Sequence, residues 1–205
     1  MSVKIKICGI TNLEDGLVAS KLGADSLGFI FAPSPRNIEP EMVKNIIKNL
    51  PPFITTVGVF KDEALDVVKK IIRFTGIDVI QLHGSEPPEY CRRIKGVRII
   101  KRIKIDHNSN SDDIVKEMVR YSVSAYLFDP GDGSGNIFNW KIIKGIKGSI
   151  IVGGGLNQDN VKIMIELLKP YGVDVCSGVE KFPGKKDPEK VKDFIKEVRR
   201  CSLQV

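Results

Sequence analysis

The chain has few of the residues that hold a fold together through covalent bonds or metal ions. Among 205 residues there are four cysteines and two histidines. The cysteines Cys8, Cys91, Cys176 and Cys201 form no CxxC pair and show no spacing typical of metal ligands. We therefore expect reduced thiols, no bound metal ion and a cytoplasmic location, because disulfide scaffolds belong to oxidising compartments.

Long apolar runs are also missing. No run approaches the ~20 residues that a membrane-spanning helix needs. The chain begins with a strand-like segment and not with the apolar core of a signal peptide. The hydrophobic fraction of 42% and the charged fraction of 28% are those of an ordinary globular protein. We expect no association with a membrane.

Positive charge is in excess, but it is not gathered in the way that nucleic-acid-binding proteins show. Lysine and arginine number 32 against 25 acidic residues, a net charge of +7. The lysines are spread along the chain and often lie beside acids, as in Lys61-Asp62-Glu63. No strand or helix interleaves basic with aromatic residues. We expect no nucleic-acid partner, since a small anionic substrate or solvated helix faces explain the charge as well.

Segments typical of β-strands alternate along the chain with segments typical of helices. The expected strands are Val3–Ile7, Ser26–Phe31, Thr55–Phe60, Val79–Leu82, Ile99–Ile103, Ala125–Phe128, Ile150–Val152 and Val173–Cys176. Apolar residues at helical spacing predict the helices Leu13–Leu22, Pro40–Leu50, Glu63–Phe74, Glu86–Ile94, Asp112–Tyr121, Asn157–Leu168 and Pro188–Arg200, with a short one around Trp140–Ile146.

This alternation predicts an α/β fold whose parallel strands are joined by helical crossovers. Eight strand–helix units predict a compact (β/α)8 TIM barrel in one domain over residues 1–205, below the ~250 residues typical of that fold. The alternative is an open, doubly wound sheet, which needs fewer strands and a GxGxxG turn that is absent here. In such a barrel the carboxyl ends of the strands carry the site.

The first strand carries a thiol beside two lysines. Strand alternation places Lys4, Lys6 and Cys8 on one face and the apolar residues on the other. An inward lysine is costly unless an anion meets it, and a thiol near lysines favours the thiolate, which acts as a base or a nucleophile. The pattern therefore predicts a reactive cysteine at an anion-binding site. The alternative is an edge strand with solvated lysines and an inert core cysteine.

Two glycine-containing segments follow the last two strands. Gly153-Gly154-Gly155 precedes a helix that Asn157 is expected to cap, and Ser177-Gly178 follows the eighth strand. Glycines let backbone N–H groups approach a phosphate, and loops after strands seven and eight often hold one in these barrels. We predict a phosphate-binding cradle at this place, although a triple glycine is also simply a flexible turn.

Two further charged residues lie at predicted strand ends. Asp129 follows an apolar run, where a carboxyl has a raised pKa and acts as an acid; its alternative is a turn residue in Asp-Pro-Gly-Asp-Gly. Gly131–Gly135 indicates a mobile loop over the site, such as a lid. Arg36 lies in a proline-rich loop and is suited to hold a carboxylate in a bidentate fork; its alternative is a solvated loop charge.

The remaining thiols and the histidine at a strand end are less specific. His83 fits a hydrogen-bonded structural group somewhat better than a catalyst. Cys91 and Cys201 fall in helical patterns and are expected to be inert. Cys176 lies beside the predicted cradle and is expected to be a packing residue.

Together these residues make the chain resemble the phosphoribosylanthranilate isomerase family, (β/α)8-barrel enzymes of tryptophan biosynthesis. The matching segments are Lys6-Ile7-Cys8-Gly9-Ile10-Thr11, Gly23-Ala24-Asp25, Gly28-Phe29, Phe31 through Ser34-Pro35-Arg36, Val57-Gly58-Val59-Phe60, Gln81-Leu82-His83-Gly84, Asp129, Gly133-Ser134-Gly135, Gly154-Gly155-Leu156-Asn157, Asp174-Val175, Ser177-Gly178-Val179-Glu180 and Pro183-Gly184-Lys185-Lys186-Asp187. They follow the family's order over nearly the whole chain, and the first and last are its specific ones.

The resemblance implies an Amadori rearrangement of N-(5′-phosphoribosyl)anthranilate to an aminoketose phosphate, by one acid and one base and without a cofactor. It makes Asp129 the acid that opens the ribose ring and Cys8 the base that removes the C2′ proton, with Lys6 favouring the thiolate. It assigns the substrate's carboxylate to Arg36. Its phosphate is assigned to backbone groups of Gly154, Gly155, Ser177 and Gly178, and His83 and Asp174 are further possible site residues.

Four positions depart from the family pattern without touching the proposed acid or base: Val152, Cys176, Asn139 and Asp132. The rival functions are another sugar-phosphate barrel, such as the aminoaldose isomerase of histidine biosynthesis, a non-catalytic binder of phosphorylated metabolites, and a nucleic-acid-binding module. The first uses a carboxylate at the end of strand one, and the second has no need for both Cys8 and Asp129. Both a monomer and a homodimer are compatible with the sequence.

Overall fold

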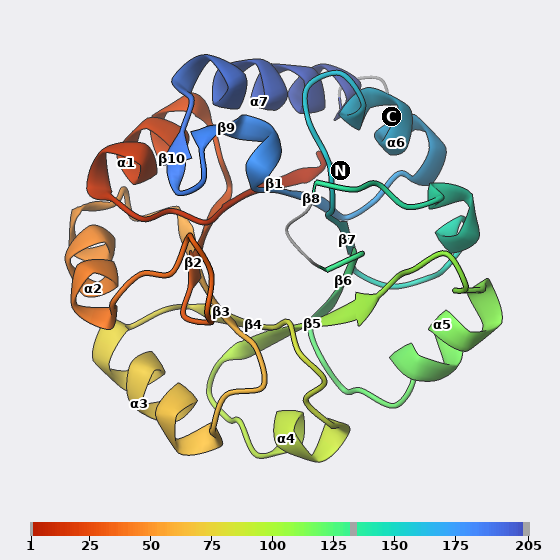
Figure 1. The fold of residues 1–205 in the computed structure, drawn as a ribbon, viewed down its shortest axis with the longest axis horizontal. Coiled ribbons are helices and arrows are strands. Elements are labelled where there is room, and N and C mark those ends of the chain that lie inside the picture. Colours follow the sequence, from red (N-terminus) through yellow and green to blue (C-terminus); the bar gives the residue numbers. More distant parts are fainter. Residues whose placement is uncertain (1, 132–134, 203–205) are drawn as a thin grey trace.

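The computed structural model, which describes residues 2–131 and 135–202, has a closed barrel of eight parallel strands at its centre (Figure 1). Each strand pairs with the next one along the chain, and β8 pairs with β1. The strands are β1 (Lys4–Cys8), β2 (Ser26–Ile30), β3 (Thr55–Phe60), β4 (Val79–Leu82), β5 (Arg98–Lys104), β6 (Ala125–Asp129), β7 (Ile150–Val152) and β8 (Gly172–Val175). The predicted fold class is confirmed.

Helices surround the barrel on its outside (Figure 1). They are α1 (Leu13–Leu22), α2 (Pro40–Asn49), α3 (Leu65–Thr75), α4 (Pro88–Arg92), α5 (Ser111–Met118), α6 (Val161–Leu168) and α7 (Pro188–Ser202). Between β6 and β7 the described residues form one short 3-10 helix, η1 (Trp140–Ile143). This agrees with the short helix that the sequence predicts there. No helix of the described residues is long and apolar enough to span a membrane.

Three strands, β1, β5 and β6, end one residue later than the sequence indicated. β1 includes Cys8, because its pairing with β2 continues to Gly28, and β6 includes Asp129, which pairs with Lys104 of β5. The proposed base and acid therefore lie on the last positions of strands and not in loops. Strand residues are held by the hydrogen bonds of the barrel on both sides, so their side chains have fixed directions.

The start of the helix after β7 differs from the expectation. The sequence predicted a helix from Asn157, whereas α6 begins at Val161. The Oδ1 atom of Asn157 accepts hydrogen bonds from the amides of Asp159, at 2.9 Å, and Asn160, at 3.1 Å. Asn157 thus closes a separate turn ahead of α6 and is not its cap.

The carboxyl end of β8 leads into a small hairpin that the sequence did not indicate. The 3-10 helix η2 (Ser177–Val179) is followed by β9 (Glu180–Phe182) and β10 (Lys185–Lys186), which pair antiparallel. This hairpin lies between β1 and α7 in Figure 1. The hairpin carries the charged side chains Glu180 and Lys186, which lie close to Arg36.

The hydrophobic core has two layers. The larger layer lies between strands and helices and includes Ile5 and Ile7, which are fully buried. The smaller layer fills the inside of the barrel with Val57, Val79, Ile100, Ala125, Leu127 and Ile151. These residues close the amino-terminal part of the barrel, and the polar side chains gather at the opposite mouth. The fold thus gathers the residues singled out from the sequence around an opening at the carboxyl ends of the strands.

Candidate active site

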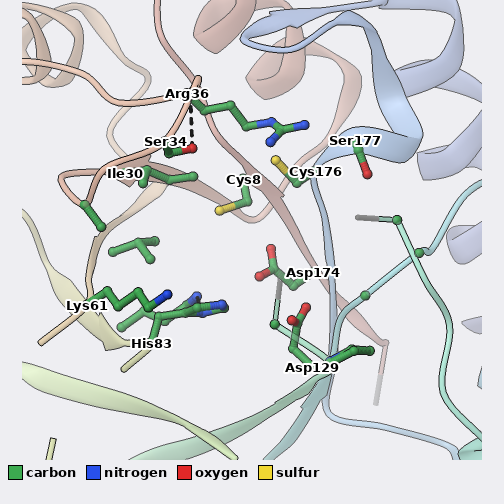
Figure 2. Close-up of a pocket in the computed structure, with 18 of the residues that line it drawn as sticks. Cys8, Ile30, Ser34, Arg36, Lys61, His83, Asp129, Asp174, Cys176 and Ser177 are labelled. Carbon is green, nitrogen blue, oxygen red and sulfur yellow. Dashed lines mark hydrogen bonds between the residues drawn. The ribbon is translucent and has the colours of Figure 1, made fainter. Parts of the chain in front are cut away.

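A cavity of about 440 Å³ opens at the carboxyl ends of the strands (Figure 2). Most of the residues that the sequence singled out line it: Cys8, Arg36, His83, Asp129, Gly154, Gly155, Asp174 and Ser177. Lys6 and Gly178 lie directly behind this lining. Cys176, which was expected to be a packing residue, also lines the cavity and is only partly buried; that expectation was wrong.

Lys6 lies inside the barrel and is paired with an anion. Only 4% of its surface is exposed, and its ammonium contacts both carboxylate oxygens of Asp174 at 2.9 Å. Burial alone would lower the pKa of Lys6, but the Asp174 carboxylate and the Cys8 thiol raise it above its usual value. The lysine is therefore charged, and the alternative of an edge strand with solvated lysines is excluded.

The second lysine of the first strand does not belong to the site. Lys4 lies at the other end of β1, is exposed and forms an ion pair with Asp25 at 3.0 Å. The sequence placed both lysines on the face of the thiol, which is correct for the alternation. Only Lys6, two residues before Cys8, is close enough to act on it.

The thiol of Cys8 has a lowered pKa. A hydrogen bond from the Cys176 thiol lowers the pKa of Cys8 to about 7; burial works against this shift, and the ammonium of Lys6 supports it. The same hydrogen bond raises the pKa of Cys176. Room for the thiol comes from Gly28 of β2, where a Cβ would lie 2.8 Å from the Cys8 sulfur. Near neutral pH a large fraction of Cys8 is therefore thiolate.

The carboxyl of Asp129 has a raised pKa, in contrast to the lowered pKa of Cys8. Burial raises the pKa of Asp129 to about 6, and the carboxylate of Asp174 adds to the rise, whereas Arg102 and Lys6 oppose it. Arg102 also fixes the local backbone, since its Nη2 donates to the carbonyl of Pro130 at 3.0 Å and its Nη1 to that of His83 at 2.9 Å. The strand end thus presents a carboxyl that holds a proton at higher pH than usual.

Arg36 already holds a carboxylate, which belongs to the protein itself. Its Nε and Nη2 donate to the carboxylate of Glu180 at 2.9 and 2.8 Å, and both side chains are buried. Lys186 is 2% exposed and donates to the same carboxylate at 2.9 Å. The three side chains carry a net charge of +1 at the cavity wall, and Nη1 of Arg36 makes no hydrogen bond to the described part of the chain. The alternative of a solvated loop charge is excluded.

His83 lies in the cavity as a neutral imidazole. Burial, together with the surrounding cations Arg102, Lys6, Lys61 and Lys101, lowers the pKa of His83 to about 3. Nε2 of Gln81 lies 3.2 Å from Nδ1 of His83. An amide nitrogen only donates, so Nδ1 accepts and the proton is on Nε2. His83 is therefore a hydrogen-bond donor in the cavity and not an acid or base near neutral pH.

The predicted phosphate cradle consists of two backbone segments that touch. Gly154 and Gly155 have φ angles of +81° and +64°, which favour glycine. Their N–H groups make no hydrogen bond to the described residues and are available to an anion. A Cβ at Gly178 would lie 1.9 Å from the carbonyl oxygen of Leu156, so the segment after β8 lies directly against the loop after β7.

Several contributors were not found from the sequence. The Glu180 and Lys186 pair was invisible because Glu180 is 144 residues from Arg36 and comes from the unexpected hairpin. Gln81 lies on β4, two positions before His83, which follows the strand. This spacing places both side chains on one face of the strand, so the sequence pattern could have identified Gln81 as a neighbour of His83. Residues 132–134 of the predicted lid, Gly131–Gly135, lie outside the described residues. Cys91 and Cys201 are buried on α4 and α7, away from the cavity.

The cavity brings together the residues predicted to bind two anions and the candidate acid and base. The cavity is lined by Arg36, by Gly154, Gly155 and Ser177, and by Cys8 and Asp129. Figure 2 shows Asp174 between Cys8 and Asp129. Asp174 acts on both Cys8 and Asp129 through its charge. Such an arrangement is suited to proton transfers on a small substrate that carries two negative groups.

Comparison with known proteins gives one consistent family. The model of N-(5′-phosphoribosyl)anthranilate (PRA) isomerase matches residues 5–197. The N-(5′-phosphoribosyl)anthranilate isomerase of Pelobacter propionicus is 46% identical over 202 residues, which cover 95% of this chain and 94% of the relative.

Solved structures agree with the sequence relatives. A phosphoribosylanthranilate isomerase in complex with reduced 1-(o-carboxyphenylamino)-1-deoxyribulose 5-phosphate is 38% identical, with a TM-score of 0.86 over 97% of this chain and 99% of that one. A structure of monomers generated from the dimeric phosphoribosylanthranilate isomerase of Thermotoga maritima is 37% identical, with a TM-score of 0.85 and the same two coverages.

Proposed function

The chain belongs to the family of N-(5′-phosphoribosyl)anthranilate isomerases of tryptophan biosynthesis, and from this we propose that Cys8 and Asp129 carry out its rearrangement as base and acid. The proposal concerns the residue roles. The substrate is an aminoaldose phosphate that also bears an aromatic carboxylate. The product is the corresponding aminoketose, so the net chemistry moves protons and needs one donor and one acceptor.

The two ends of the cavity would hold the two anions of the substrate. The amides of Gly154 and Gly155, with those of Ser177 and Gly178, suit the phosphate because they lie in two adjoining backbone segments and donate hydrogen bonds without a counter-charge. Arg36 suits the carboxylate, because Glu180 fixes Nε and Nη2 while Nη1 makes no hydrogen bond to the described residues. The ribose then lies between Cys8 and Asp129.

Asp129 would protonate the ring oxygen of the ribose, and the ring would open to an iminium. Its raised pKa of about 6 supports this role, because it keeps a usable fraction of the acid near neutral pH. Cys8 would then remove the C2′ proton as the thiolate, which its pKa of about 7 supplies. The resulting enolamine relaxes to the ketone, and no cofactor enters these steps.

The observation that carries the proposal is the shared cavity. A thiol with a lowered pKa and a carboxyl with a raised pKa end two different strands and face one space between two anion-binding ends. Paired groups whose surroundings shift their pKa values in this manner are typical of acid–base catalysis. A protein that only binds phosphorylated metabolites has no use for both.

A fluorescence time course tests the activity. The substrate is generated in place from anthranilate and phosphoribosyl pyrophosphate, and its fluorescence is followed after the purified protein is added. We expect a decay that depends on the protein and gives the aminoketose. A folded protein that binds inorganic phosphate and yields no decay would contradict the assignment.

We also propose that the protein forms a homodimer through the amino-terminal end of its barrel. Phe53, in the loop before β3, is 95% exposed beside a hollow of about 360 Å³ that is lined by Val57, Val79 and Ile100. Charged residues, among them Lys4, Asp25 and Arg98, also line this hollow. An exposed phenylalanine beside its apolar wall fits insertion into a second copy. The related Thermotoga maritima enzyme is dimeric. One domain over residues 1–205 and a cytoplasmic location stay predictions.

A further inference from the structure

Two thiols lie next to each other at the mouth of the barrel. β1 and β8 are parallel neighbours, and the last pair of their register is Ile7 opposite Val175. The next residue of each chain segment is Cys8 and Cys176. Neighbouring strands lie about 4.7–4.9 Å apart, which is within the ~4.4–6.8 Å between Cα atoms that a disulfide spans.

Both side chains point into the barrel. Alternation puts Cys8 on the face of Lys6 and Cys176 on the face of Asp174, and these two partners meet inside the barrel at 2.9 Å. The two thiols are near enough for each to shift the pKa of the other. Both cysteines line the cavity and carry their sulfurs into it in Figure 2. The two sulfurs therefore share one solvent-connected space.

Cations lie close to the pair, together with the carboxylates of Glu180, 3.9 Å from the Cys176 sulfur, and of Asp174. The ammonium of Lys186 lies 3.8 Å from the Cys176 sulfur, and the charges of Lys6 and Arg36 act on the thiols from two sides. Cations favour the thiolate, which is the form that reacts with peroxides. The other two cysteines lack this setting, because neither Cys91 nor Cys201 lines the cavity.

We propose that Cys8 and Cys176 are a modification site for hydroperoxides, at which Cys8 is oxidised and Cys176 closes a disulfide with it. The Cys8 thiolate attacks one oxygen of the peroxide, the O–O bond breaks, and Cys8 becomes a sulfenic acid while hydroxide leaves. The sulfur of Cys176 then attacks the Cys8 sulfur, and the sulfenic oxygen leaves as water with the Cys176 proton. In sum, two thiols and one hydrogen peroxide give one disulfide and two waters.

The disulfide would switch the enzyme off reversibly. It consumes the thiolate of Cys8 and, in the proposed mechanism, removes the base. A ligand that fills the cavity shields both sulfurs, so the resting enzyme is more sensitive than the working one. The loss of activity rests on the proposed role of Cys8, whereas formation of the disulfide does not.

The test is oxidation of the full chain with hydrogen peroxide, followed by mass measurement and by peptide mapping without reduction. We expect the wild-type protein to lose two hydrogen atoms in mass and to yield one linked peptide pair that contains Cys8 and Cys176. Turnover should fall about 100-fold, the scale of losing a general base, and return with dithiothreitol. Reduced aminoketose phosphate, added beforehand, should slow all three changes.

Two variants sharpen the test, each compared with its own untreated rate. Cys176→Ser should gain oxygen atoms at Cys8 in place of losing hydrogen, and its activity should stop returning once sulfinic acid forms. Cys91→Ser is the matched control and should behave as the wild type. A wild-type protein that gains oxygen, or that links other cysteines, would overturn the proposal. A linked pair that leaves turnover intact would uphold the site and refute the role of Cys8 as base.

Discussion

At the scale of single residues, one ion pair sets the charge at the reacting groups. Asp174 neutralises Lys6 inside the barrel and also acts on Cys8 and Asp129 from between them (Figure 2). Its negative charge opposes ionisation of both groups. It therefore supports a protonated Asp129, while the thiolate of Cys8 depends on the hydrogen bond from Cys176 and on Lys6.

The pH dependence of kcat/KM follows from these shifts. Cys8 must have lost its proton, with a pKa of about 7, and Asp129 must have kept its proton, with a pKa of about 6. The rate falls below about pH 6 because the thiolate is lost, and above about pH 7 because the protonated carboxyl is lost, so it is highest near pH 6.5. Initial rates over this range check the prediction. A rate that still rises at about pH 8 contradicts it.

Cys176→Ala provides the control for this profile. Without the hydrogen bond from Cys176, the pKa of Cys8 rises toward its usual value. The maximum then becomes lower, because fewer molecules hold thiolate and protonated Asp129 together, and the alkaline limb moves to higher pH. An unchanged profile would show that Cys176 does not act on the base.

Glu180→Gln tests how the Arg36 fork is held. Loss of the Glu180 charge leaves Arg36 less firmly oriented, so we expect KM to rise about tenfold, equivalent to ~1.4 kcal/mol of binding, with kcat nearly unchanged. Steady-state kinetics separate the two constants. Glu189→Gln removes an exposed carboxylate that pairs with Lys192 on α7 and should leave both constants unchanged. A fall in kcat without a rise in KM would contradict the positioning role.

The sequence identifies this set of residues only in part. Cys8 could be found because it ends a strand that carries lysines, and Asp129 because it follows an apolar run, at strand ends where the fold places reactive groups. The partner of Arg36 could not be found, since Glu180 and Lys186 lie in a short hairpin without a periodic pattern. The place of Cys176 was missed because a cysteine after an apolar strand fits packing as well as a site.

At the scale of elements, close approach between loops shapes the phosphate cradle. Gly178→Ala would place a methyl group 1.9 Å from the Leu156 carbonyl oxygen, so the two segments must move apart. We expect a loss of about 1–3 kcal/mol in the free energy of unfolding and weaker binding of phosphate. Urea unfolding and competition by inorganic phosphate measure the two effects.

Gly16→Ala in α1 is the matched control. A Cβ there would lie 3.5–3.6 Å from its nearest neighbours, an ordinary contact. Because alanine favours the helix over glycine, the variant should be as stable as the wild type or more stable by about 0.5–1 kcal/mol. Equal stability of the two variants would contradict the close packing at Gly178.

Element order and type follow from the sequence because each strand and helix carries its own apolar period. The ends of strands and helices are less well defined by the sequence, since they depend on hydrogen bonds with neighbouring segments. β1 continues to Cys8 because β2 offers Gly28 as a partner, and α6 starts late because Asn157 hydrogen-bonds in a turn of its own. The apolar period of β1 or of α6 indicates neither the pairing with Gly28 nor the turn at Asn157.

At the scale of the whole molecule, Phe53 is the feature that a free barrel does not explain. If it enters the hollow of a second copy, Phe53→Ser should convert a dimer to a monomer and lower the thermal midpoint. Sedimentation equilibrium measures the mass directly. Val119→Ser changes another exposed apolar side chain, 76% exposed after α5, and should leave the dimer intact. A wild-type monomer would contradict the proposed interface.

Turnover and ligand binding by Cys8→Ala and Asp129→Asn, measured side by side, test the central claim most directly. Both changes are small and leave the anion-binding ends untouched. We predict that each lowers kcat by about 100-fold or more, while reduced aminoketose phosphate still binds with nearly wild-type affinity. Wild-type turnover in either variant would contradict the role given to that residue.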